Sequence, residues 1–222
     1  MHSDILDKLT ATFPPAAAEV IRAGASRRGY PRKRVIYHQD APADGIHIML
    51  AGCVMLEWIS ASGDVVGYRV ATRGDFVGHR SYFAEEPRSA TARTVTDSET
   101  LFIAGTTLKH AIEADPRVCC HFAREVGRDA GPQLSRVVRN HKIPSIARLA
   151  YMLDHLSRKL ARRSGEGNGE RGVDACTPFP LTQQDLAHLL DIRNETVSRL
   201  VREMEERGIL HFENRPRRVA IP

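Results

Sequence analysis

The chain has 222 residues, of which 42% are hydrophobic and 27% are charged, close to the average of globular domains. This composition disfavours disordered, collagen-like and membrane proteins, and the longest apolar runs, such as IHIML and GCVML, are far too short to cross a bilayer. The net charge of +5 permits a polyanionic partner, but many enzymes are equally basic. Any prediction of nucleic-acid binding must therefore depend on geometry.

The N-terminal stretch MHSDILDKLTATF is acidic and amphipathic, and it has neither the basic start nor the apolar run of an export signal. We therefore expect a cytoplasmic protein without a membrane partner. The sequence contains no CxxC pair, nucleotide P-loop or HExxH pattern. An enzyme is thus the least supported class, no metal site is predicted, and the cysteines are expected to be free thiols. They are Cys53, Cys119, Cys120 and Cys176.

Short runs rich in Val, Ile, Tyr and Phe extend from about Arg34 to Ile103. The runs RVIYHQ, IHIMLAGCVMLEWI, VVGYRVA and ATARTV are separated by segments rich in Gly, Asp, Ser and Pro. Short strands at this spacing predict a small all-β sandwich or roll. We interpret the basic cluster RRGYPRKR, residues 27–34, as a solvated surface.

The hydrophobic period changes to three or four residues after Asp115, which predicts a long helix that begins near DPR and kinks near Pro132. Its single apolar stripe needs a partner surface. The residues alone leave two interpretations open: packing on the β-domain, or pairing with a second copy across a dimer axis. The stripe consists of Val118, Phe122, Val126, Ala130, Leu134 and Val137.

The C-terminal part has the pattern of a winged helix-turn-helix. Helical spacing resumes from about Ile146 to Lys159, and the Gly-rich stretch RRSGEGNGERGVD that follows is predicted to be a loop. Thr182 and Asp185 then form the pattern of a capping box for a helix over QQDLAHLL. Asp191 follows at a sharp turn that requires a positive φ.

A second helix is predicted from Asn194 to about Arg207, where Gly208 is positioned to end it. The remaining stretch ILHFENRPRRVAIP predicts two short strands around a turn. Helix, tight turn, helix and hairpin together predict the winged arrangement.

One face of this second helix, opposite its apolar residues, carries Glu195, Ser198, Arg199 and Arg202. It is either an ordinary solvated face, with Glu195 and Arg199 as an i, i+4 ion pair, or a face that enters the DNA major groove. In the groove an Arg can donate two bonds to guanine, and a Glu can accept one from cytosine N4. Seven arginines balance seven carboxylates over residues 180–222, so the net charge of this region gives no argument for binding to DNA. Polar residues at the start of the second helix favour DNA.

The stretch LTQQDLAHLLDIRNETVSRLVREMEERGIL resembles the DNA-binding motif of Crp/Fnr-type bacterial transcription regulators. Within that family, ETVSR resembles the Fnr-type pattern, whereas cyclic-AMP regulators usually carry Gly where Ser198 stands. The resemblance implies a homodimer that reads a palindrome of double-stranded DNA with TTGA-like half-sites, with RNA polymerase as a further partner. It also favours the dimer interpretation of the long helix.

The resemblance assigns roles to individual residues. It implies DNA base contacts for Glu195, Ser198 and Arg199. It implies DNA backbone contacts for Thr182, Arg193, Asn194 and Arg202. The implied dimer helix uses Val118, Phe122, Val126, Leu134 and Val137. Asp191 departs from the family's usual Gly, and Arg193, which departs from its small hydroxyl residue, is either a phosphate contact or a poor helix cap.

The stretch GDFVGHRSYFAEEPRSATART resembles the family's phosphate-binding cassette. It makes Arg88 and Ser89 the implied holders of a cyclic phosphate. His79, however, replaces the Glu that holds the ribose, and Gln133 and Leu134 replace the Thr and Ser that meet adenine, which argues against a cyclic nucleotide. The candidate effector pocket consists of Gly78, His79, Arg88, Ser89 and Gln133.

Other cofactors are also disfavoured. His79 aligns with the axial histidine of the family's carbon-monoxide sensor, but Val77 replaces the partnering cysteine, which argues against haem. An Fnr-type iron–sulfur cluster needs several cysteines near the N-terminus, and none precedes Cys53. Cys119 and Cys120 are interpreted first as packing residues and second as a thiol redox sensor.

The sequence as a whole predicts an α+β protein in three parts. They are a sensory, cyclic-nucleotide-binding-like β-roll (residues 1–114), a dimerisation helix (115–141) and a winged helix-turn-helix DNA-binding domain (142–222). An unidentified signal in the roll would move the long helices about a hinge near residues 140–145 and so set the spacing of the recognition helices. The alternative is a cyclic-nucleotide-binding regulatory module that acts on a protein partner.

Overall fold

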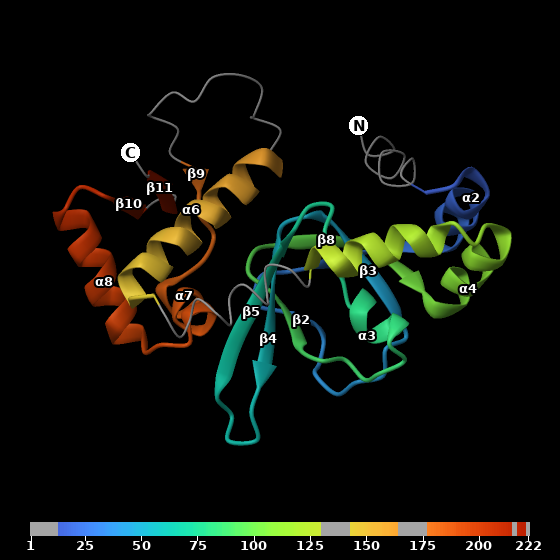
Figure 1. Cartoon of the computed structure of the whole chain (residues 1–222), viewed down its shortest axis with the longest axis horizontal. Coiled ribbons are helices and arrows are strands. Elements are labelled where there is room, and N and C mark those ends of the chain that lie inside the picture. Colours follow the sequence, from blue (N-terminus) through green and yellow to red (C-terminus); the bar gives the residue numbers. More distant parts are fainter. Residues whose placement is uncertain (1–12, 130–142, 164–176, 215–216, 221–222) are drawn as a thin grey trace. The chain divides into compact units, whose positions relative to one another are not determined.

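The structure, a computed structural model, describes residues 13–129, 143–163, 177–214 and 217–220. The chain forms two compact units (Figure 1). One, here called the roll unit, contains residues 1–63 and 69–134, and the other, the C-terminal unit, contains residues 64–68 and 135–222. No helix in the described ranges is long and apolar enough to cross a membrane.

Two four-stranded sheets form the β-roll, with the strand orders β1-β8-β3-β6 and β2-β7-β4-β5. The strands are β1 (Ala25–Tyr30), β2 (Val35–Tyr37), β3 (Gly45–Ala51), β4 (Cys53–Ile59), β5 (Val65–Thr72), β6 (Phe76–Val77), β7 (Thr91–Thr94) and β8 (Ser98–Ala104). The predicted roll is confirmed. The charged residues of the basic cluster 27–34 are exposed, as expected for a solvated surface, and the first two, Arg27 and Arg28, lie in β1.

Helices cover one face of the first sheet. They are α2 (Pro15–Gly24), α4 (Gly105–Ala114) and the helical residues 118–129, while α3 (His79–Phe83) follows β6. Alternate residues of β3 and β8, such as Ile46, Ile48 and Leu101, are buried in this core, as the period of two in a strand requires. The helices contribute Ile21, Leu108 and Ala111 among others to the same core.

The first turns of the long helix belong to this core. Val118 is 0% exposed and Phe122 is 2% exposed, and both pack with the apolar residues of the roll. Their assignment to a dimer face is therefore wrong, because a side chain buried in its own unit has no surface left for a second copy. Val126 is half-buried. The predicted positions Ala130, Pro132, Gln133, Leu134 and Val137 lie outside the described residues.

The C-terminal unit has the predicted winged helix-turn-helix order. It contains α6 (Ser145–Arg163), β9 (Thr177–Pro178), α7 (Gln183–Leu190), α8 (Asn194–Glu206), β10 (His211–Asn214) and β11 (Arg217–Ala220), with the strand order β10-β11-β9. Its three helices pack through apolar residues spaced three or four apart. The buried set includes Leu149, Leu153, Leu156, Leu186, Leu189, Leu190, Val197, Leu200, Val201 and Met204. Most of the predicted Gly-rich loop lies outside the described residues.

Candidate nucleic-acid interface and effector pocket

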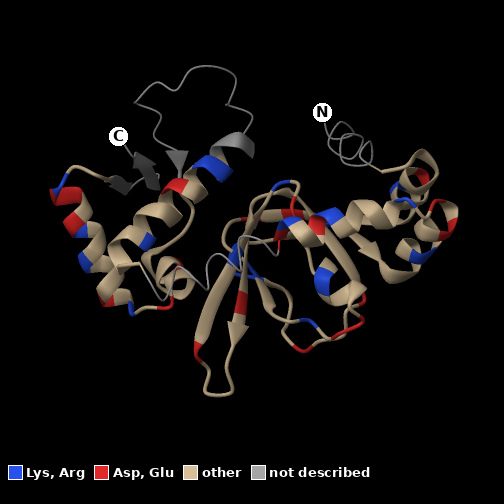
Figure 2. Ribbon diagram, in the orientation of Figure 1, with Lys and Arg blue, Asp and Glu red and all other residues tan. Residues whose placement is uncertain are grey.

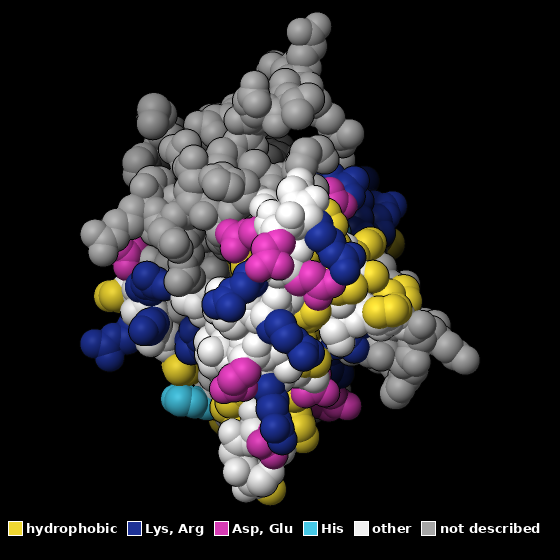
Figure 3. All heavy atoms as spheres, turned by 90° about the vertical axis from the view of Figure 1, so that its left-hand side faces the viewer, with side chains coloured by type: hydrophobic (Ala, Val, Ile, Leu, Met, Phe, Trp, Pro, Cys, Tyr) yellow, Lys and Arg dark blue, Asp and Glu magenta, His cyan; other side chains and the backbone are white. Residues whose placement is uncertain are grey.

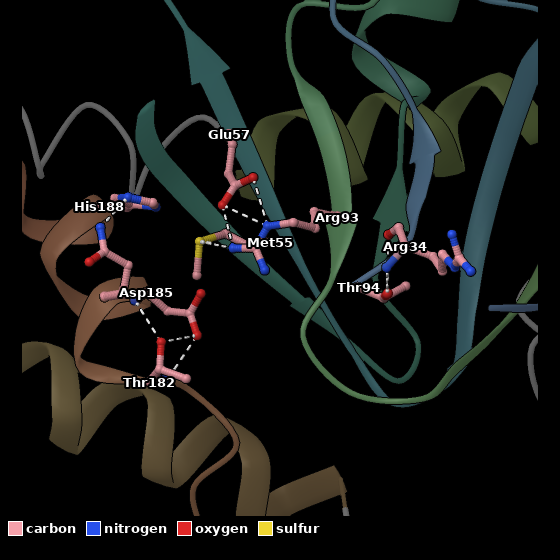
Figure 4. Close-up of polar contacts among 9 residues, drawn as sticks. Arg34, Met55, Glu57, Arg93, Thr94, Thr182, Asp185 and His188 are labelled. Atoms are coloured by element: carbon pink, nitrogen blue, oxygen red, sulfur yellow. Dashed lines mark hydrogen bonds and ion pairs between the residues drawn. The ribbon is translucent and has the colours of Figure 1, made fainter. Parts of the chain in front are cut away.

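The first helix of the helix-turn-helix begins with a complete capping box (Figure 4). Asp185 N donates to Thr182 Oγ1 at 3.1 Å, and Thr182 N donates to Asp185 Oδ2 at 2.8 Å. The Thr182 hydroxyl also donates to Asp185 Oδ2 at 2.8 Å. The predicted cap is confirmed, but both donors of Thr182 are used in it. This arrangement leaves neither donor for a DNA phosphate.

The turn between the two helices has the predicted left-handed residue. Asp191 has φ 53° and ψ 55°, and Ile192 N donates to Ala187 O at 3.2 Å across the turn. This pattern satisfies carbonyls at the end of a helix. Arg148 of α6 adds a bond from Nη2 to Leu190 O at 2.7 Å. The orientation of α8 relative to α7 is thus fixed by backbone geometry and by a side chain from a third helix.

The start of α8 has no side-chain cap. Arg193 is in an extended conformation and forms no capping hydrogen bond, as expected for a poor helix cap. The side chain itself is exposed. A helix N-terminus carries free N–H groups and a partial positive charge, and it therefore attracts phosphate. An uncapped end with an exposed arginine suits a negatively charged partner.

The two sides of α8 are clearly different. Val197, Leu200 and Met204 are buried, whereas Glu195, Arg199 and Arg202 are exposed and Ser198 is half-buried. Both basic and acidic residues lie along the ribbon of α8 in Figure 2, and Figure 3 shows Lys and Arg side chains mixed with Asp and Glu side chains over the described part of that side.

Glu195 and Arg199 do not form the ion pair that an ordinary solvated face would use. Neither is paired with any other residue in the described part of the chain. Both side chains are therefore available to an outside partner. At its far end the helix stops at Gly208, as predicted, with φ 67° and a bond from Ile209 N to Met204 O of 2.9 Å.

In the roll unit, Arg88 is buried, with 1% of its surface exposed. Its Nη2 donates to Asp44 Oδ1 and to Gly45 O, each at 2.8 Å, and its Nη1 donates to Gly78 O at 3.0 Å. The guanidinium also lies over the ring of Tyr37 at 4.4 Å. Gly78 has φ +81°, and a Cβ there would lie 2.2 Å from Arg88 Nη1. Only glycine fits at this position.

These contacts bear directly on a cyclic phosphate. Both terminal nitrogens of Arg88 are bound to acceptors of the chain itself, and Ser89 N donates to Ser81 Oγ at 3.1 Å. A phosphate bound to Arg88 would compete with the Asp44 carboxylate for the same guanidinium nitrogen, and the two negative charges would repel each other. The residues therefore do not fit a cyclic nucleotide in the arrangement that the structure has. Of the predicted pocket, Gly78, His79 and Arg88 are close to one another in the fold.

His79 begins α3 and is 2% exposed. Its Nε2 lies 3.2 Å from Asp129 Oδ2, and the same oxygen lies 2.8 Å from Arg69 Nη1. Sequence reasoning selected His79 but neither of these neighbours, nor Asp44 beside Arg88. Asp129 and Asp44 lie far from the cassette in the sequence, and no local pattern marks them.

The described cysteines are free thiols, as expected, but two of them differ from expectation in their exposure. Cys119 and Cys120 are both exposed, which contradicts the interpretation of them as packing residues, whereas Cys53 is buried. All three are free thiols, and Cys176 lies outside the described residues. The neighbouring His121 packs on the ring of Phe13 at 4.4 Å, and burial lowers its pKa. In the described ranges, no group of three or more His, Cys, Asp or Glu side chains could hold a metal ion.

Comparison with known proteins agrees with this architecture. The Cyclic nucleotide-binding domain family matches residues 27–115, and the Crp-like helix-turn-helix domain family matches residues 147–222. The cAMP-activated global transcriptional regulator CRP of Haemophilus influenzae is 23% identical over 82% of this chain and 78% of its own length. The anaerobic regulatory protein of Bacillus subtilis is 22% identical over 88% of this chain and 79% of its own length.

Among solved structures, the c-di-GMP responsive global regulator CLP of Xanthomonas campestris superposes with a TM-score of 0.75 at 20% identity, covering 94% of this chain and 99% of that one. The two matched domains, in this order, define a DNA-binding transcription regulator with a cyclic-nucleotide-binding-like domain. The chain belongs to the Crp/Fnr family of bacterial transcription regulators.

Proposed function

We propose that the protein binds DNA as a homodimer and reads a palindrome with TTGA-like half-sites. The observation that carries this proposal is the exposed polar face of α8, on which Glu195 and Arg199 lie one turn apart and have no partner among the described residues. An arginine can donate two bonds to guanine, and the nearby carboxylate can accept from cytosine N4. Ser198, between them, supplies a hydroxyl that can donate or accept.

The proposed contacts with the DNA backbone lie at the start of α8 and on its exposed side. Arg193 and Asn194 lie at the uncapped N-terminus, where a phosphate is favoured, and Arg202 is exposed one turn beyond Ser198. Thr182 is not among the proposed contacts, because its backbone N–H and its hydroxyl both donate to Asp185. Val126, Leu134 and Val137 are the proposed dimer contacts, and the last two lie outside the described residues. RNA polymerase is the proposed further partner in the cytoplasm.

The signal that controls binding is not a cyclic nucleotide in this proposal. Relatives with the same architecture carry names that point to cAMP, to anaerobic regulation and to c-di-GMP. The fold therefore does not determine the effector. In this chain the cassette arginine is already bound to Asp44, Gly45 and Gly78, which supports control by a different signal.

The test is the Arg199→Ala variant. We expect it to lose about 1 to 3 kcal/mol of discrimination between a TTGA palindrome and the same duplex with one guanine contact replaced. Fluorescence anisotropy at fixed salt would measure both affinities. The matched control is Arg207→Ala, because Arg207 lies at the end of α8 and pairs with Glu203 at 2.5 Å. Its specificity should equal that of the wild type.

Arg202→Ala separates positioning from base reading. It should weaken binding to all sequences alike and lower the salt dependence, because it removes one phosphate contact. If Arg199→Ala reduced binding to specific and scrambled duplexes by the same factor, the base-reading role would be refuted. If the wild type showed no salt-dependent DNA binding at all, a module that acts on a protein partner would be the better account.

A further inference from the structure

A nearly buried cluster of charged side chains joins three elements of the roll unit. Arg69 on β5 and His79 at the start of α3 both approach a single oxygen, Oδ2 of Asp129, at 2.8 Å and 3.2 Å. Asp129 lies in the last described turn of the helical residues 118–129. The side chains are 12%, 3% and 25% exposed, respectively. We call these three residues the Asp129 cluster.

Two members of the cluster, Arg69 and His79, also contact Phe76 of the roll. Arg69 Nη1 also donates at 2.8 Å to the carbonyl oxygen of Phe76, in strand β6 of the cassette. The ring of His79 packs edge-on against Phe76, with centroids 6.0 Å apart. Nε2 of His79 lies near the carboxylate but not in hydrogen-bond alignment with it, so the guanidinium of Arg69, at 2.8 Å, is the charged partner of Asp129 in the cluster. Ion pairs at such low exposure are screened far less than surface pairs.

The helix is attached to the roll at two places of different chemistry. At its start, Val118 and Phe122 are buried in the apolar core. Between this attachment and Asp129, Ala123, Arg124, Gly127 and Arg128 are exposed. The apolar packing of Val118 and Phe122 does not depend on charge, whereas the contact of Asp129 with Arg69 does. The end of the described helix is therefore positioned by the Asp129 cluster.

We propose that the Asp129 cluster is a latch that orders the end of this helix and so pre-organises the dimer for DNA. Asp129 is a positioning residue in this mechanism, acting through the helix without touching DNA. An unlatched helix has more conformational freedom, which must be lost when two recognition helices bind half-sites at a fixed spacing. Opening the latch therefore weakens DNA binding. This second step rests on the proposed function, whereas the latch itself does not.

Asp129→Asn tests the latch, because it removes the charge and keeps the size of the side chain. In the full-length protein without DNA, we expect amide hydrogen exchange in the last turns of residues 118–129 to become about tenfold faster. Affinity for the palindrome should fall by about the same factor. The matched control is Glu125→Gln, one turn earlier on the same helix, where Glu125 pairs with the exposed Arg128. It should change neither quantity.

Arg69→Gln provides a second route to the same result. If the two residues act through one contact, the double variant Arg69→Gln with Asp129→Asn should exchange no faster than either single variant. Fluorescence of Trp58, the single tryptophan, would verify that the roll is folded in each variant. Unchanged exchange in Asp129→Asn would overturn the latch. Faster exchange with unchanged DNA affinity would overturn the proposed link between the order of the helix and DNA binding. If the wild type did not bind the palindrome, the proposed function would be refuted, and the exchange rates alone would still test the latch.

Discussion

At the scale of single residues, His47 shows how strongly the roll interior controls charge. It is buried on β3, where Nδ1 lies 3.1 Å from Thr100 Oγ1 and the ring packs 4.9 Å from that of Phe102. Burial, together with the nearby guanidinium groups of Arg88 and Arg28, lowers the pKa of His47 from 6.5 to about 3. His47 is therefore neutral in the folded protein at every physiological pH.

This shift predicts a loss of stability in acid. Between its unfolded pKa of 6.5 and its folded pKa of about 3, the unfolded state binds a proton that the folded state does not. Stability is thus full above that window and falls as the pH decreases through it. In the wild type, the free energy of unfolding should decrease from about pH 7 to about pH 5, and we expect His47→Asn to make this decrease smaller by about 1 to 2 kcal/mol. Urea unfolding followed by Trp58 fluorescence would measure both slopes.

The control for this prediction is His110→Asn, since His110 is exposed. Its pH slope should match that of the wild type, whereas parallel slopes for His47→Asn and the wild type would contradict the role of His47. The substitution will also cost some packing against Phe102, but that cost is the same at each pH.

The same scale shows what the sequence could and could not predict about the pocket. The motif located Arg88 and His79, because both stand in a recognisable stretch. Their partners Asp44 and Asp129 come from a distant loop and a distant helix, which only the packed fold brings near. Exposure was equally hard to predict: Cys119 and Cys120 follow the buried Val118, yet both face solvent.

At the scale of elements, the capping box of α7 holds the start of the helix-turn-helix. Thr182→Ala removes the acceptor for Asp185 N and the hydroxyl donor to its carboxylate. We expect it to destabilise the C-terminal unit by about 1 kcal/mol, the usual cost of losing such a cap. Thermal melting followed by circular dichroism would measure this. Thr182→Ser keeps the hydroxyl and should stay near the wild type, and equal loss in both variants would refute the capping account.

Elements with a strong local signal could be predicted from the sequence. The cap at Thr182, the left-handed turn at Asp191 and the stop at Gly208 each follow from the chemistry of one or two residues, and all are confirmed. The long helix shows the limit of this reasoning. Within the described residues 118–129, its period correctly predicted an apolar face. The period does not tell which surface that face contacts, and the packing of Val118 and Phe122 on the roll depends on the whole fold.

At the scale of the whole molecule, the proposed dimer predicts that affinity depends on whether the DNA contains one half-site or two. Two recognition helices that bind half-sites about one helical turn apart gain from effective concentration. We therefore expect a duplex with one half-site scrambled to bind about a hundredfold or more weakly than the intact palindrome. Titration monitored by native mass spectrometry would give affinity and stoichiometry together, with two chains on each palindrome. One chain per duplex, with equal affinity for both duplexes, would exclude the dimer.

The edge strand β1 has a consequence for how separate molecules meet. It lies at the end of its sheet, and its burial is low except at its two ends. Arg27 pairs with Glu99 at 2.7 Å, while the guanidinium of Arg28 lies over the ring of Phe102. Charged side chains on an edge strand discourage another strand from adding to the sheet. The arginines of β1 thus protect the roll from strand-to-strand aggregation, and they leave self-association to surfaces that do not extend the sheet.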